Sequence, residues 1–321
     1  MRNPLLRLLT AATLAICATS LHAQGAATRI VVPFAPGGAQ DVIGRYLAER
    51  LATRTGSTVI VENKAGAGGV IAADAVAKAP ADGRTLLLAT GGAITIAPHL
   101  NPKLGYDPRK DFVPVALVAD TPMTLATRAQ SPYTNVADVL KDARDNPGRV
   151  SYASTGNGTI SHLTGELLAQ SAGVQLLHVP YRGAGPAITD LLGGQVALMV
   201  TSAASIEPMV LDKKARVLAS FTRERIGALQ GAPTMTEAAG LKGLEVPVWV
   251  GLLAPSGTPQ ASVDKLAADL VAICRQPETQ ERFKALGAAT TCGGPADLAR
   301  VIAEDDGRWE RVIQQGKIKL N

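Results

Sequence analysis

Short apolar runs and segments of helical spacing alternate along most of the chain. Apolar, β-branched runs predict strands, and apolar residues spaced three and four apart with a polar face between them predict helices. In the first 90 residues this gives strands at 28–34, 57–64 and 85–90, with helices at 41–54 and 70–79. The resulting βαβαβ order is typical of a parallel sheet covered by helices on both faces.

The alternation continues to the C-terminus. Further extended runs occupy 111–119, 124–129, 149–155, 176–182, 195–201, 216–222 and 246–255. Helical spacing recurs at 135–145, 159–173, 184–194, 260–276, 278–287 and 295–315. Pro122 and Pro247 lie in extended stretches where the character of the chain changes. We interpret them as two crossings between lobes, with 24–123 and 246–321 in lobe one and 124–245 in lobe two.

The first 23 residues are predicted to be a secretory signal peptide. Arg2 and Arg7 precede an apolar run, and small residues end it at Ala23. The run is too short for a membrane anchor, so we expect cleavage near Ala23 and an exported, periplasmic protein. Loss of these two arginines lowers the formal net charge from +5 to about +3.

Composition narrows the range of ligands. Basic and acidic residues are interspersed, whereas a nucleic-acid protein would show a basic stripe, so no nucleic-acid partner is expected. Only two Trp, five Tyr and four Phe occur, which argues against the flat aromatic platforms of sugar or nucleobase sites. The mature chain retains Cys274 and Cys292, read either as a disulfide or as two buried thiols, with the disulfide favoured for an exported protein.

Two loops, 30–41 and 152–159, share one design. Each leads from a predicted strand through glycine and small polar residues into a helix. The N–H groups at a helix start and the helix dipole favour an anion, and glycine allows close approach. In the first loop the candidates are Gly38, Ala39 and Gln40, and Asp41 is either a helix cap or a partner for a ligand amine. In the second loop they are Ser154, Gly156, Asn157, Gly158 and Thr159, with a solvated turn capped by Thr159 as the alternative.

Other motifs do not indicate a cofactor, a metal or catalysis. The glycine run at 66–69 lacks the third glycine of a dinucleotide fingerprint, because Ile71 stands there. No metal-binding motif occurs, and a hydrolase pairing of Ser154 or Ser161 with His162 lacks a nucleophile elbow. Thr90 is a further candidate at a strand end. Arg182 is either the cation for a distal carboxylate or a solvated side chain, and the solvated reading is slightly favoured.

The chain resembles the Bug-type receptors, the extracytoplasmic solute-binding components of tripartite tricarboxylate transporters. Ordered blocks along the whole chain carry the resemblance, among them VPFAPGGAQD, YASTGNGTISHLTGELL, HVPYRGAGPAITDLLGGQVALM and WVGLLAPSGTP. It implies a type II-like periplasmic binding protein with two α/β lobes, each a mainly parallel sheet flanked by helices, joined by two crossover segments. It also implies a receptor that delivers a small organic anion to membrane permease subunits. A monomer is the default expectation for such a shuttling receptor, and neither a cofactor nor catalysis is expected.

By position, the resemblance adds Phe34 to the first loop and implies that both loops hold a ligand carboxylate, partly through ordered waters. Many relatives carry an acid near Thr201, which here offers a hydroxyl without charge. A mono- or dicarboxylate is therefore expected rather than an amino acid. The alternatives are a receptor that contacts a sensor kinase and a secreted hydrolase.

Overall fold

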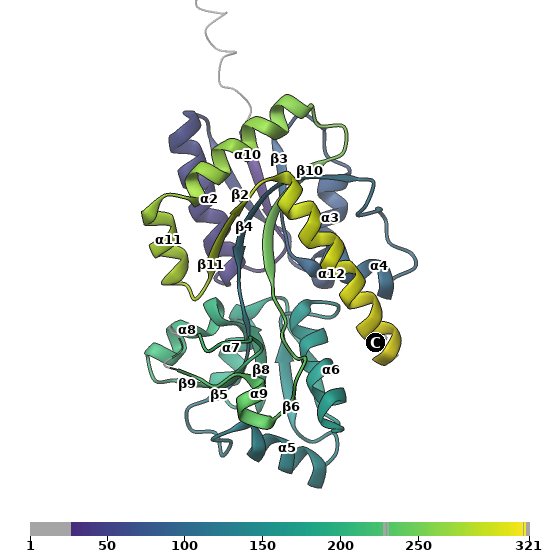
Figure 1. Ribbon diagram of the computed structural model, residues 1–321, viewed down its shortest axis with the longest axis vertical. Helices are drawn as coiled ribbons and strands as arrows, with labels where there is room; N and C mark the ends of the chain where they lie inside the picture. The colour runs from purple at the N-terminus through teal and green to yellow at the C-terminus, as the bar shows by residue number, and fades with distance from the viewer. Residues whose placement is uncertain (1–26, 227–228, 230, 317, 319–321) are drawn as a thin grey trace, which may run out of the picture.

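The computed structural model describes residues 27–226, 229, 231–316 and 318, which fold into two lobes (Figure 1). The predicted signal peptide and its cleavage point near Ala23 lie outside these residues. Lobe one contains β1 (Thr28–Val32), α2 (Ala39–Thr55), β2 (Val59–Asn63), α3 (Val70–Ala77), β3 (Thr85–Ala89), α4 (Ala97–Leu100), β4 (Phe112–Asp120), β10 (Trp249–Pro255), α10 (Gln260–Cys274), α11 (Pro277–Lys284), β11 (Ala289–Gly293) and the start of α12 (Pro295–Gly316). Lobe two contains β5 (Met123–Arg128), α5 (Val136–Asp145), β6 (Ser151–Ser154), α6 (Ile160–Ala172), β7 (Leu177–Pro180), α7 (Ala184–Leu192), β8 (Leu198–Ser202), α8 (Ala203–Leu211), β9 (Ala215–Ser220) and α9 (Met235–Ala239).

Each lobe is built on one sheet. The strand order is β11-β4-β10-β3-β1-β2 in lobe one and β7-β6-β8-β5-β9 in lobe two. The two-lobed α/β fold is therefore confirmed, but the sheets are mixed rather than mainly parallel. β1 pairs in parallel with β2 and β3, and β6 with β7 and β8, while β10 and β5 run antiparallel to both of their neighbours. The two crossings explain this, because β10 returns to lobe one beside β4, the strand that leaves it, and β5 begins at the crossing and runs away from it.

The last helix joins the two lobes. α12 begins beside the sheet of lobe one and runs to the side of α6 in lobe two (Figure 1). Near its middle, Asp305 accepts hydrogen bonds from Thr95 (2.7 Å) and Trp249 (2.9 Å) of lobe one. One helical turn further on, Trp309 is fully buried in the same apolar cluster as residues of β5, β6 and α6. The predicted division placed all of 246–321 in lobe one, whereas the second half of α12 packs against lobe two.

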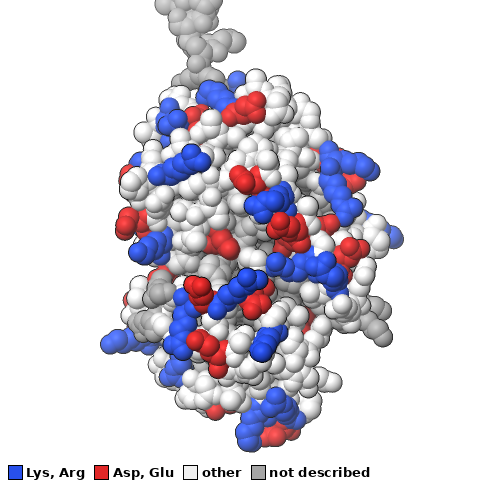
Figure 2. Space-filling model, viewed as in Figure 1, with Lys and Arg blue, Asp and Glu red and all other residues white. Residues whose placement is uncertain are grey.

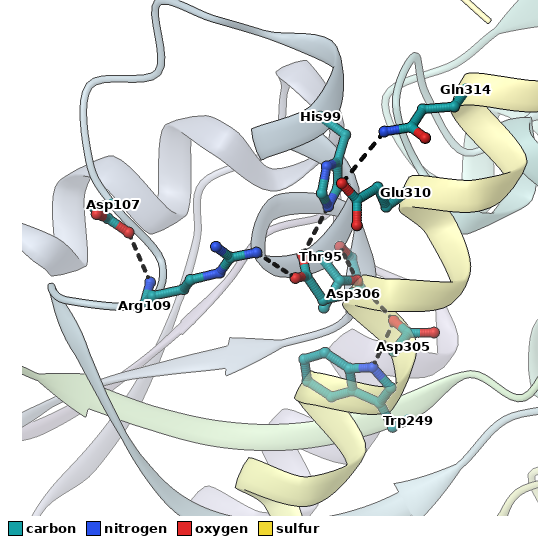
Figure 3. A network of polar contacts seen from close by, with 10 residues as sticks. Thr95, His99, Asp107, Arg109, Trp249, Asp305, Asp306, Glu310 and Gln314 are labelled. Carbon is teal, nitrogen blue, oxygen red and sulfur yellow. Dashed lines mark hydrogen bonds and ion pairs between the residues drawn. The ribbon is translucent and has the colours of Figure 1, made fainter. Parts of the chain in front are cut away.

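Polar contacts fix α12 to lobe one along its exposed side as well. Figure 3 shows Asp306 between His99 and Arg109, with nitrogen–oxygen distances of 2.8 Å and 2.6 Å. Gln314 bonds Glu310 one turn along the same helix. α12 is thus bonded to lobe one near its middle and packed into lobe two by its second half.

The two cysteines form a disulfide that links the end of α10 to β11, with the Cα atoms 5.3 Å apart. The sequence favoured this pairing over two free thiols. Elsewhere, charge is mixed: basic and acidic side chains alternate over the face shown in Figure 2, without a basic stripe there. Among the described residues, no helix is long and apolar enough to span a membrane.

Candidate functional site

The carboxyl ends of β1 and β3 face those of β6 and β8 across the boundary between the lobes. Open α/β sheets bind ligands at this edge. A small cavity of about 30 Å³ lies between these strand ends, and we call it the inner cavity. Its lining comprises Phe34, Gln40, Thr90, Met123, Thr155, Thr159, Ile160, Ser161, Thr201, Ser202, Ser205 and Val248. Both predicted loops therefore face one shared space.

A second space of about 350 Å³, the outer cavity, lies beside the first. Phe34 and Thr155 line both cavities. The remaining lining of the outer cavity is Pro33, the loop 65–69, Ile71, Gly156, Asn157, Pro180, Tyr181 and Arg182. The inner cavity has the size of one small polar group, and the outer cavity offers room for the remainder of a ligand.

The first loop ends at the N-terminus of α2, next to lobe two. The Ala39 N–H donates to the Ser205 Oγ at 3.3 Å, a hydrogen bond between the lobes. Gln40 lines the inner cavity, and the backbone N–H of Gln40 has no partner among the described residues. Gly38 precedes the helix as its N-cap, and a Cβ atom at this position would lie 3.7 Å from the Ala184 Cβ of lobe two. Of the N–H groups at 39 and 40, the one of Gln40 is thus without a partner within the described chain, at the start of α2.

Asp41, predicted as either a helix cap or a ligand contact, is buried and lines neither cavity. Its carboxylate accepts hydrogen bonds from the Gly37 N–H (3.0 Å), Arg45 (3.0 Å) and Asn63 (2.8 Å). Burial opposes ionisation, but these three donors outweigh it and lower the pKa of Asp41. The residue caps and braces the first turn of α2 instead of meeting a ligand amine.

The second loop reaches the inner cavity mainly through its last residue. The Thr159 side chain caps α6 by accepting from the His162 N–H at 3.3 Å, and it lines the cavity. Gly156 and Asn157 line the outer cavity. Ser154 and Gly158, also predicted as ligand contacts, line neither cavity. Ser154 and Gly158 instead hydrogen-bond His178 and His162, respectively, and so hold the loop in its conformation.

Two stacked imidazoles hold the second loop in place. The His162 and His178 ring centroids lie 4.0 Å apart. The Gly158 N–H donates to His162 Nδ1 at 3.3 Å, and Ser154 Oγ lies 2.6 Å from His178 Nε2. Burial lowers the pKa of His162 to about 4, and burial together with the neighbouring His162 lowers that of His178 to about 3. Both rings are therefore neutral at neutral pH.

This geometry also argues against the hydrolase alternative. The Ser154 hydroxyl is fully buried under the loop and reaches neither cavity, so a substrate cannot meet it. The Ser161 hydroxyl donates to the Val200 carbonyl and does not contact His162. No cluster of three or more metal-binding side chains occurs among the described residues.

We expect an acid-sensitive fold from these two histidines. Their folded-state pKa values lie below the unfolded value of about 6.5, so the stability they contribute is complete above that pH. This stability is lost as the pH falls toward about 4, because protonated His162 can no longer accept the hydrogen bond from the Gly158 N–H at Nδ1. Urea unfolding between pH 7.5 and 4.5 measures this loss, and His162→Asn should flatten the slope. A midpoint independent of pH in the native protein would refute the assignment.

The sequence interpretation missed the contribution of α8. Ser202, Ser205 and Thr201 all line the inner cavity, and α8 starts there with Ser202 as its N-cap. The Ser202 and Ser205 hydroxyls lie 2.9 Å apart. Thr201 was predicted, and its buried Oγ1 has no hydrogen-bond partner among the described residues. The sequence signal that could have placed Thr201, Ser202 and Ser205 at the cavity was a strand ending in Thr-Ser directly before a helix.

Three helix N-termini, those of α2, α6 and α8, therefore meet at the inner cavity. Among its lining residues there is no Lys, Arg, Asp or Glu, and its polar groups are hydroxyls, the Gln40 amide and backbone. Thr90, which directly follows β3 and was a predicted candidate, also lines this cavity. Neutral donors together with three helix dipoles favour a compact anion.

A larger groove of about 800 Å³ lies at the β11 edge of the lobes. It is lined mainly by α11, β11 and the turn between them, and it includes Glu281 and several alanines. Neither predicted loop contributes to it. The two predicted loops therefore meet at the inner cavity and not at this groove.

Two α/β lobes with a cavity lined by hydrogen-bond donors between them are typical of solute-binding receptors, and this protein has both features. The family model described as "Tripartite tricarboxylate transporter family receptor" matches residues 43–318. The chain therefore belongs to this receptor family, a family of transport proteins and not of enzymes, which agrees with the expectation from the sequence.

Solved structures support the assignment. The periplasmic binding protein BugD is similar at a TM-score of 0.87 and 38% identity, over 91% of this chain and 98% of that one. A Rhodopseudomonas palustris protein solved with adipate is similar at a TM-score of 0.87 and 34% identity, over 92% of this chain and 98% of that one. MatC from the same organism, solved with bound malate, is similar at a TM-score of 0.85 and 35% identity, over 90% of this chain and 99% of that one. The Bug-type resemblance seen in the sequence is thereby confirmed.

Proposed function

We propose that the inner cavity binds one carboxylate of a small organic acid and that the lobes enclose the rest of the ligand. The observation that carries this proposal is the buried Thr201 Oγ1, which lacks a partner within the described chain and lines a cavity where three helices begin. An unpaired buried hydroxyl is costly, and a carboxylate oxygen would satisfy it. Donors must converge because removing a carboxylate from water costs far more than burying a neutral group.

The relatives support the same ligand class. The proteins solved with malate and with adipate share at least 34% of their residues with this chain. Both ligands are dicarboxylates. The site here contains no acid that would pair with a ligand amine, because Thr201 is uncharged and Asp41 faces away from both cavities. A carboxylate without an amino group therefore fits best.

The proposed mechanism is closure of the lobes on the anion. In this structure the lobes already touch, through the Ala39–Ser205 hydrogen bond and through the Ala35 N–H, which lies 3.4 Å from the Arg182 carbonyl. A ligand shifts an open–closed equilibrium only by contacts that it makes in the closed form. Donors contributed by both lobes supply such contacts.

Membership in the receptor family supports transport as the role. We propose that the mature protein, released by cleavage near Ala23, works in the periplasm as a monomer and delivers its ligand to the permease subunits of a tripartite tricarboxylate transporter. Neither nucleic acid nor a cofactor has a part in this role.

Isothermal titration calorimetry with malate and adipate tests the binding proposal. We expect dissociation constants in the micromolar range or tighter, about −8 kcal/mol, for at least one acid, and no binding of the corresponding diamides. Thr201→Val should weaken binding about tenfold, because it removes one charge-assisted hydrogen bond. Thr189→Val, on the exposed surface of α7, is the matched control. No heat from any acid in a broad carboxylate panel would contradict the proposal.

A further inference from the structure

The strand order of the two sheets sets the direction in which a ligand extends from the inner cavity. β1 lies between β3 and β2, and β6 lies between β8 and β7. The ends of β1, β3, β6 and β8 surround the inner cavity, and those of β1, β2, β6 and β7 surround the outer one. A ligand held by one carboxylate in the inner cavity therefore extends toward β2 and β7.

Part of the wall of the outer cavity along this path is apolar. Phe34, Pro33, Pro180 and Ile71 contribute carbon surface, and Ile71 is 52% exposed, unusual for so large an apolar side chain. Such walls suit methylene groups. The glycine loop at 66–69 adds backbone and no further side chains that could pair with a charge.

Arg182 is the one charged residue among those that line the outer cavity. The parallel pairing of β6 with β7, which sets Ser154 opposite Pro180, brings the loop after β7 beside the loop after β6. The Arg182 carbonyl faces the Ala35 N–H of lobe one, so the residue sits where the lobes meet. The nearby Asp190 carboxylate is bonded to the Tyr181 hydroxyl at 2.7 Å. Within the described chain, no ion pair or side-chain hydrogen bond engages the Arg182 guanidinium.

We propose that Arg182 binds a second anionic group at the far end of the ligand, so that the receptor selects α,ω-dicarboxylates over monocarboxylates of the same length. This inference rests on the proposed function, in which the first carboxylate occupies the inner cavity. A guanidinium pairs with a carboxylate through two parallel hydrogen bonds, and it needs an acceptor that this protein does not supply. The apolar walls between the two ends accommodate the carbon chain.

Calorimetry with matched acids tests the assignment. The probes are the linear dicarboxylates from succinate to pimelate, each paired with the monocarboxylate of equal carbon number, such as adipate with hexanoate. In the native protein we expect a dicarboxylate preference of about fivefold at the best length, since the guanidinium is exposed and partly screened. Arg182→Met should abolish the preference without weakening hexanoate binding, and Arg182→Lys should keep part of it.

Two controls separate the outcomes. Arg144→Met, on an exposed arginine of α5 remote from both cavities, should leave every affinity unchanged. The preference of the native protein should also fall with added salt, and that of Arg182→Met should not change. If Arg182→Met still preferred dicarboxylates, or lost affinity equally for both acids of each pair, the role assigned to Arg182 would be wrong. The proposed function would not be affected by either result. Failure of every acid to bind the native protein would instead overturn the proposed function and this inference together.

Discussion

Gly68→Ala is expected to weaken carboxylate binding by tenfold to hundredfold. Gly68 lies in the loop after β2, and a Cβ atom there would stand 2.6 Å from the Asn157 carbonyl oxygen of lobe two. That oxygen belongs to the backbone and cannot move alone, so the lobes would have to stay further apart. Overpacking of this kind costs about 1–3 kcal/mol, and here the cost falls on the closed form only.

The matched control is Gly56→Ala. Gly56 has a φ of 66° and Gly68 one of 64°, so alanine is strained equally at both, but a Cβ at Gly56 would meet nothing within 4 Å. Gly56→Ala should therefore lower stability without changing affinity. Calorimetry with the same acids, together with small-angle scattering of the ligand-bound protein, measures both effects. Native affinity and a native bound shape for Gly68→Ala would show that the two loops do not approach in the closed receptor.

Trp309→Ala is expected to produce the largest loss of stability, about 3–5 kcal/mol. The side chain is fully buried, and it sits on a helix that starts in lobe one and packs into the core of lobe two. Its removal leaves a cavity between α12 and the β5–β6 region. Because α12 is held in lobe one through Asp305 and Asp306, the lost packing also weakens the connection between the lobes.

Trp309→Phe serves as the control. The Trp309 indole N–H has no hydrogen-bond partner in the described part of the chain, so phenylalanine loses mainly volume. We expect Trp309→Phe to unfold in urea close to the native midpoint and Trp309→Ala well below it. Equal midpoints for the two variants would mean that α12 does not contribute to the core of lobe two in solution.

Local patterns predicted most strands and the longer helices because each has its own spacing of apolar residues, whereas α4, α8, α9 and the edge strand β11 were not predicted. They also indicated the capping residue Thr159, since threonine at the start of a helix acts through local geometry. The mixed sheets were not predicted, because the direction of β10 depends on where the chain crosses between lobes.

The partners of individual side chains at the site could not be predicted from local patterns, and the reason is the same in each case. Whether Asp41 faces a ligand or Arg45 depends on Asn63, which comes from the neighbouring strand. Ser154 likewise turns to His178 across a strand pair. α8 was missed because its place at the cavity follows from the pairing of β8 with β6, which lie more than 40 residues apart in sequence. Such partners are set by the tertiary fold.

A crystal structure of the mature protein with bound malate or adipate tests the central claim most directly. One ligand carboxylate should occupy the inner cavity, within hydrogen-bond distance of the Thr201 hydroxyl and of N–H groups at the starts of α2 and α6, directly or through one water. A carboxylate bound elsewhere, with the inner cavity empty or filled by water alone, would contradict the account.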